Sequence, residues 1–142
     1  MEEQQEKSLQ RESVSIEIAA KPTPFNELDA ELKLAIHSIG EKKGIDIVAL
    51  DLRDIASFTE FFVIASGTNQ RQVQAMADEI NEQLKKQLGS RPVRIEGYNS
   101  ADWVLLDYGD FIIHLFNTEG REFYDLARLW RDARRVELPA EI

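Results

Sequence analysis

The chain has 142 residues and a mass of 16.3 kDa, which suits one domain with a sizeable hydrophobic core. No apolar run approaches the ~20 residues of a membrane-spanning helix, and the lack of cysteine excludes disulfides, thiol nucleophiles and thiolate metal sites. The net charge of −9 disfavours non-specific nucleic-acid binding and suits a basic protein partner, because complementary charges speed encounter.

The first 25 residues are predicted to form a flexible polar tail. Gln, Glu and Ser dominate this segment, and the two prolines of Lys21–Pro24 prevent a helix from continuing through it. The alternation of Val14, Ile16 and Ile18 with polar residues leaves a short edge strand as an alternative. The N-terminus has neither the basic nor the apolar region of a signal peptide, so we expect a cytoplasmic protein.

The domain is expected to comprise residues 26–142 and to open with an amphipathic helix. Apolar residues recur at helical spacing over Leu28–Ile39, and Asn26 is a potential N-cap. Gly44 is expected to end this helix in the left-handed conformation.

Two dense apolar segments, residues 45–52 and 61–65, then predict strands, and the second is apolar at every position and hence interior. The next helix is expected to start at Asn69, because Asn69 with Gln72 three residues later resembles a capping box. Gly89 is expected to end it.

The stretch Asp102–Phe116 predicts a β-hairpin, because two apolar runs flank the polar turn Asp107–Asp110. Both runs are so densely apolar that we expect the hairpin to be central and covered on both faces. A short strand precedes it at 92–96, where the proline favours a strand start or a sheet edge. A last helix is expected from Asn117 to a group of arginines that ends at Arg135.

The predicted order is helix, strand, strand, helix, strand, strand, strand, helix. Such an order indicates an α/β fold with a mixed five-stranded sheet and helices packed on its faces. The connection from 61–65 through the second helix to 92–96 is long enough for a right-handed parallel crossover.

Two patterns suggest ligand sites, and simpler roles explain both. Ser66–Thr68 joins a strand to a helix, where an anion could bind, but no phosphate-binding motif is present and capping accounts for these residues. Asp51, Asp107 and Asp110 would hold Mg²⁺ only if they converged, and strand-end capping by Asp51 and turn roles for Asp107 and Asp110 account for them more simply.

The two histidines do not suggest catalysis. His37 lies on the polar side of the first helix, and His114 lies within an apolar strand, which favours a hydrogen-bonded core histidine over a general base. No Ser/His/Asp set can be assembled. We therefore expect no enzyme, no cofactor and no metal.

Several ungapped blocks resemble the ribosomal silencing factor (Iojap-like) family, and their order and spacing agree from Leu28 to Val136. The blocks are Ile47–Arg53, Phe61–Thr68, Glu96–Tyr98, Ala101–Asp110 and Arg121–Leu126 with Leu129–Trp130. The resemblance implies an α/β fold with a nucleotidyltransferase-like outline but without catalytic aspartates. It also implies a translational repressor that binds large-subunit ribosomal protein fourteen and blocks joining of the ribosomal subunits under starvation.

The family's pattern places the contact around the strand that ends at Asp107 and at the following turn. The residues implied are Trp103, Leu105, Asp107, Tyr108 and Asp110. Alternation along a strand gives the first three a common direction. An aromatic centre with an acidic rim suits a Lys- and Arg-bearing protein, and no membrane or sequence-specific nucleic acid is implied.

Two other functions remain open. One is a self-associating scaffold, because interface aromatics serve a homodimer equally well. The other is a residual nucleotide-binding, nucleotidyltransferase-like protein, which would need a nucleotide and Mg²⁺ near Ser66–Thr68 and Asp51.

Overall fold

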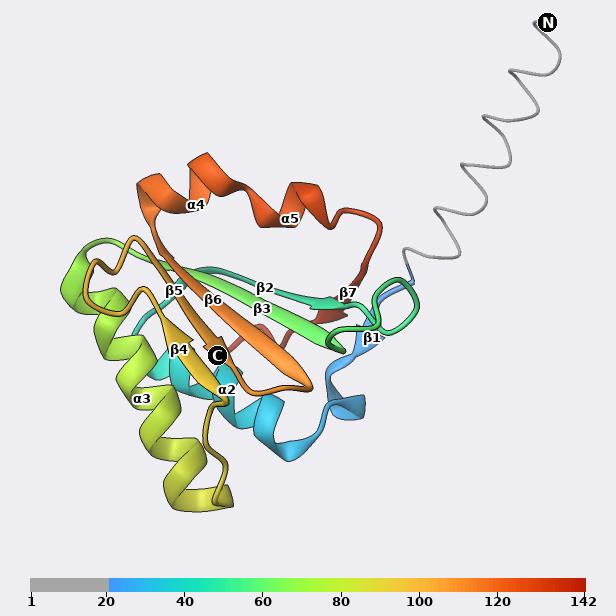
Figure 1. Ribbon diagram of the computed structural model, residues 1–142. Coiled ribbons are helices and arrows are strands. Elements are labelled where there is room, and N and C mark those ends of the chain that lie inside the picture. The colour runs from blue at the N-terminus through green and yellow to red at the C-terminus, as the bar shows by residue number, and fades with distance from the viewer. Residues whose placement is uncertain (1–20) are drawn as a thin grey trace, which may run out of the picture.

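The computed structural model describes residues 21–142 (Figure 1). The possible strand at Val14–Ile18 lies outside the described residues. Seven strands form one sheet in the order β1-β7-β2-β3-β6-β5-β4. The strands are β1 Thr23–Pro24, β2 Ile45–Asp51, β3 Phe61–Gly67, β4 Arg94–Glu96, β5 Trp103–Asp107, β6 Phe111–Asn117 and β7 Arg134–Glu137. The helices are the short 3₁₀ segment η1 Phe25–Glu27, α2 Ala30–Glu41, α3 Gln70–Leu88, α4 Thr118–Tyr124 and α5 Leu126–Leu129.

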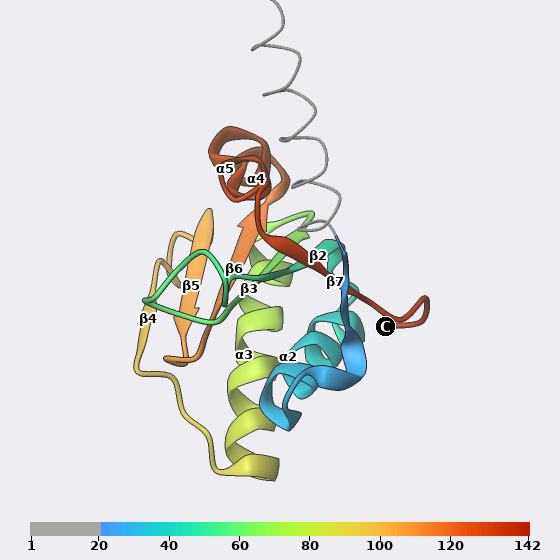
Figure 2. The same ribbon diagram turned by 90° about the vertical axis from the view of Figure 1, so that its right-hand side faces the viewer.

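The sheet separates two helical layers. Helices α2 and α3 lie on one face, and the short helices α4 and α5 lie on the other (Figure 2). Strand β3 shows why the sequence requires both layers, since Val63 and Ala65 join the core under α2 and α3 while Phe62 and Ile64 join the core on the opposite side. All seven residues of β3 are buried, which confirms the predicted interior strand.

The predicted hairpin is present, but only one of its strands is central. Strand β6 lies between β3, with which it is parallel, and β5, with which it is antiparallel, and Phe111–Phe116 is buried throughout. In β5, buried residues alternate with partly exposed ones. The expectation that both strands are covered on both faces was therefore wrong for β5, because its side chains on the face opposite α2 and α3, among them Trp103 and Leu105, are only partly covered.

The C-terminal region differs most from the predicted long helix. Asp125 adopts a left-handed conformation with φ of 43°, which divides the helix into α4 and α5. The chain then enters β7, which pairs with β2 and β1 and buries Val136. The prediction of five strands was wrong because β1 and β7 complete the sheet. Strand β1 contains Thr23, within the segment expected to be a tail.

Both predicted ends of the first helix shift. The N-cap is Asp29, whose carboxylate accepts a hydrogen bond from the Leu32 amide at 3.0 Å, rather than Asn26, which lies in η1. At the other end Lys43, with φ of 59°, adopts the left-handed conformation expected of Gly44.

The predicted ends of the second long helix are confirmed. The side chain of Asn69 accepts from the Gln72 amide at 2.8 Å, and Gly89 ends α3 with φ of 64°. The Gln72 side chain accepts from the Thr68 amide, one residue before the cap.

Candidate docking surface

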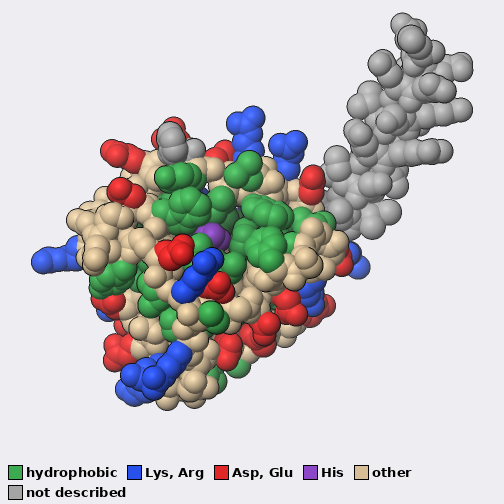
Figure 3. All heavy atoms as spheres, in the orientation of Figure 1, with side chains coloured by type: hydrophobic (Ala, Val, Ile, Leu, Met, Phe, Trp, Pro, Cys, Tyr) green, Lys and Arg blue, Asp and Glu red, His purple; other side chains and the backbone are tan. Residues whose placement is uncertain are grey.

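The sheet face opposite α2 and α3 is only partly covered. We call it the open face and define it by Trp103 and Leu105 of β5, Phe62 of β3 and His114 of β6. Apolar side chains gather on this side of the molecule around the histidine (Figure 3). The half-buried Trp103 and Leu105 pack against the second core cluster, which includes Phe62 and Phe116. Apolar atoms left near the surface in this way suit contact with another molecule.

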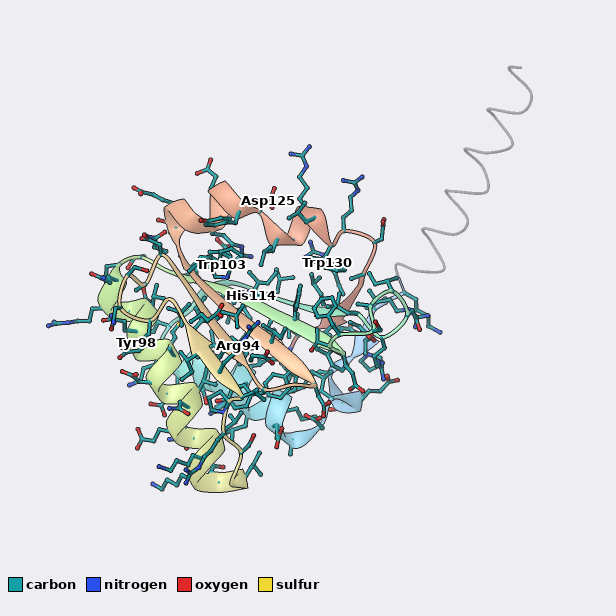
Figure 4. All side chains as sticks on the ribbon, in the orientation of Figure 1. Arg94, Tyr98, Trp103, His114, Asp125 and Trp130 are labelled. Carbon is teal, nitrogen blue, oxygen red and sulfur yellow. The ribbon has the colours of Figure 1, made fainter. Side chains whose placement is uncertain are left out.

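Trp103 is held on the open face by one hydrogen bond and by contacts with neighbouring rings. Its indole Nε1–H donates to Nδ1 of His114 at 3.0 Å. Its ring stacks on Phe116 with centroids 5.2 Å apart and contacts Tyr124 at 4.5 Å. Figure 4 shows Trp103 beside His114 on the neighbouring strand. The ring is therefore fixed, while the residue stays partly exposed.

His114 is the polar group beneath this face. The residue is 4% exposed, and burial lowers its pKa from 6.5 to about 4, so the ring is neutral near pH 7. Because Nδ1 accepts from Trp103, the ring proton resides on Nε2, which is buried and has no hydrogen-bond partner within residues 21–142. The predicted hydrogen-bonded core histidine is confirmed.

A second aromatic group lies on the same side of the sheet. Trp130 packs against Phe62 at 5.5 Å and against Phe58 at 5.8 Å, and Phe58 remains 58% exposed. From the sequence, residues 53–60 are predicted to form a polar connection held by a few apolar residues, with no separate role for Phe58. The signal available was an aromatic residue in a connecting loop of largely polar residues.

A charged group borders the aromatic surface. Asp107 accepts from the Gly109 amide at 2.8 Å and lies 3.5 Å from Nε of Arg94, which also pairs with Glu96. Figure 4 shows Arg94 below His114. Asp110 is exposed in the β5–β6 turn. Of the three expected acidic or aromatic neighbours of Trp103, Asp107 thus lies on the same face, and Asp110 lies exposed in the turn beyond it.

Tyr108 points to the other side of the sheet. Its ring stacks on Phe111 at 5.0 Å and packs against the core beneath α2 and α3. Its hydroxyl is buried without a hydrogen-bond partner among the described residues, and burial together with the charge of Glu31 raises its pKa to about 12. The structure therefore brings together Trp103, Leu105 and Asp107, and it separates Tyr108 from them.

The strand-to-helix turn has its polar groups already engaged. Ser66 Oγ accepts from Arg121 at 2.9 Å, and the Thr68 amide and hydroxyl both donate to the Gln72 side chain. These contacts match the capping role that the sequence favoured over an anion site.

Asp51 is likewise committed to the fold. It accepts hydrogen bonds from Thr23 at 2.7 Å and from Arg53 at 2.7 Å. Burial alone would raise the pKa of Asp51, but these hydrogen bonds outweigh it and the pKa lies below its ordinary value. Across residues 21–142, no group of three or more acidic or histidine side chains could hold a metal ion.

Comparison with known proteins identifies the family. A family model described as "Ribosomal silencing factor during starvation" matches residues 26–142. The chain belongs to this family of ribosomal silencing factors.

Relatives of this ribosomal silencing factor occur in bacteria and plants. A protein from Halalkalibacterium halodurans called "Ribosomal silencing factor RsfS" is 40% identical over 111 residues, covering 78% of this chain and 94% of the relative. "Protein Iojap, chloroplastic" from Arabidopsis thaliana is 33% identical over 125 residues, covering 84% of this chain and 51% of that protein. Both names confirm the family resemblance seen in the sequence.

A solved structure confirms the mixed α/β fold of this silencing factor. The crystal structure of protein CV0518 from Chromobacterium violaceum superposes with a TM-score of 0.69 at 34% sequence identity, covering 78% of this chain and 88% of that one. Among the helices that the structure describes, none is both long and apolar enough to cross a membrane.

Proposed function

We propose that this silencing factor binds large-subunit ribosomal protein fourteen in the cytoplasm and thereby keeps the small subunit from joining, without catalysing a reaction. The observation that carries the proposal is the open face, a partly exposed apolar and aromatic surface with a charged rim on a chain of net charge −9. Apolar area supplies affinity, and opposite charge on the partner supplies encounter rate.

The proposed contact centres on Trp103 and Leu105, with Asp107 and Asp110 at the rim. Trp103 suits an anchor, because its large ring is already fixed by His114 and by neighbouring rings before a partner arrives. Tyr108 supports this contact from the other side of the sheet by holding the turn, since it stacks on Phe111.

The proposed blockade is steric and is assisted by charge. The acidic residues that remain outside the contact would repel the phosphates of the ribosomal RNA on an approaching small subunit. To block joining in this way, the protein needs only affinity for the large subunit and sufficient size. Conditions such as starvation would determine how much of the protein is present or active.

Co-sedimentation with purified large ribosomal subunits tests the proposal. Trp103→Ala combined with Asp110→Lys should abolish co-sedimentation, while Glu82→Lys, an equal charge change on the exposed side of α3, should not. Circular dichroism and thermal melting of all three proteins verify that each is folded. Equal binding by the double variant would reject this interface.

A homodimer is the alternative use of the same surface, and the exposed Phe58 and the partly exposed Trp103 favour it as a second possibility. Light scattering of the protein alone and mixed with ribosomal protein fourteen distinguishes the two. A dimer that dissociates on mixing is compatible with both uses, and a dimer that persists without binding would replace the proposed function by self-association.

A further inference from the structure

The contact between Trp103 and His114 crosses from β5 to β6 on the diagonal. In the strand register Trp103 lies opposite Phe116, and His114 lies opposite Leu105. The indole Nε1–H nevertheless reaches Nδ1 of His114 at 3.0 Å. The tryptophan therefore bends along the strand towards the middle of the open face, where Figure 4 shows the two rings side by side.

The ring contacts of Trp103 do not by themselves fix its orientation. Stacking on Phe116 at an interplanar angle of 29° and contact with Tyr124 set the plane of the indole. The indole can still rotate by half a turn about its Cβ–Cγ bond, which keeps the plane of the ring but exchanges its two edges. The hydrogen bond removes this freedom, because only one edge of the indole carries the N–H donor.

His114 is suited to be a fixed acceptor. The ring is 4% exposed, meets Phe62 edge to face at 4.6 Å and lies nearly parallel to Phe116. It therefore cannot follow Trp103 if the indole turns, and it offers its Nδ1 lone pair at one place only. A fixed acceptor selects one of the orientations that the indole would otherwise sample.

We propose that His114 is a positioning residue of the docking surface, which holds Trp103 in the orientation that the partner receives. The inference rests on the proposed function, in which Trp103 is the anchor. An anchor that is ordered before binding loses less conformational freedom on association, so the hydrogen bond contributes to affinity without His114 touching the partner.

A double-mutant cycle on affinity for purified large subunits tests this inference. His114→Phe keeps a ring in the core but removes the acceptor, and it should weaken binding about tenfold, the effect of one positioned hydrogen bond. His114→Asn, whose side-chain oxygen lies near the place of Nδ1, should recover most of the affinity. In a Trp103→Phe background, His114→Phe should have no further effect, because the indole donor is already absent.

A second readout does not depend on ribosomes. In a ¹⁵N-labelled sample, the Trp103 indole proton should exchange slowly with solvent and should lose this protection in His114→Phe but not in His114→Asn. Trp130 supplies the internal reference signal. If His114→Phe does not fold, His114→Leu takes its place in both experiments.

The outcomes are distinct. The inference is overturned if His114→Phe binds large subunits as tightly as the unaltered protein does. It is also overturned if His114→Phe weakens binding by the same factor in the Trp103→Phe background, because His114 would then act other than through the indole. An unprotected Trp103 indole proton in the unaltered protein also overturns it. If the unaltered protein does not bind large subunits while its indole proton is protected, the proposed function fails and the hydrogen bond stands.

Discussion

Protonation of His114 should couple stability to pH. Burial lowers its pKa from 6.5 to about 4 in the folded protein, so the unfolded chain binds more protons between these values. The stability that depends on the neutral ring is fully present above pH 6.5 and is lost as the pH falls towards 4, by up to about 3 kcal/mol.

The stability that depends on the neutral ring can be measured by urea denaturation of the unaltered protein and of His114→Phe at several pH values between about 7 and about 4.5. Carboxylates titrate in both proteins, so the difference between the two curves isolates the histidine. We expect the unaltered protein to lose stability faster as the pH falls. Parallel curves would mean that the ring is not buried in its neutral form.

The hydroxyl of Tyr108 should contribute nothing to stability. It is buried without a hydrogen-bond partner in the part of the chain that the structure describes, whereas the ring stacks on Phe111. Tyr108→Phe keeps the ring and removes the unsatisfied group, so the free energy of unfolding should stay unchanged or rise by up to about 1 kcal/mol. Chemical denaturation measures it, and a clear loss of stability would show that the hydroxyl is satisfied.

At the scale of secondary-structure elements, the end of α2 gives two predictions, and the sequence alone would have placed the left-handed residue at Gly44 and not at Lys43. Lys43 adopts φ of 59°, a conformation that glycine takes with less strain, so Lys43→Gly should raise the free energy of unfolding by about 1 kcal/mol. Gly44→Ala should lower it by about 1–3 kcal/mol, because an added Cβ would lie 2.4 Å from Cγ2 of Ile39 and 2.9 Å from the sulfur of Met76. Urea denaturation with an unchanged m-value checks both variants, and the opposite order would contradict this account of the turn.

Elements specified by local signals could be predicted from the sequence. Helix α3 has an N-cap at Asn69, a regular apolar stripe and a terminal Gly89, and all three signals lie within or beside the helix. Strand β3 was equally clear, because a short, unbroken apolar run rich in aromatic and β-branched residues is typical of an interior strand.

Elements that depend on distant partners could not be predicted. Strand β1 forms only because Thr23 meets Val136, and β7 carries Arg134 and Arg135, which local patterns assign to the end of a helix. The predicted last helix is interrupted at Asp125, and an aspartate does not indicate a left-handed conformation in a sequence as a glycine would. Long-range pairing overrode local preference at each of these positions.

The candidate site could be predicted in part for the same reason. Alternation along β5 correctly gave Trp103, Leu105 and Asp107 a common face. Alternation ends where the strand ends, so it could not give the direction of Tyr108. The hydrogen bond from Trp103 to His114 joins different strands and becomes visible only once their register is known.

At the scale of the whole molecule, the two faces of the sheet have different roles. Helices α2 and α3 cover one face and complete the main core, while α4 and α5 leave part of the other open. A small acidic protein with one incompletely covered face is equipped to occupy the surface of a basic protein within a larger assembly. We therefore propose that it acts by exclusion.

Light scattering of purified ribosomal subunits tests that claim most directly. With the protein in excess over large subunits, joining of the small subunit should slow progressively with its concentration. The variant with Trp103→Ala and Asp110→Lys, at the same concentration, should permit joining at the uninhibited rate. Joining at the normal rate in the presence of excess unaltered protein would contradict the account.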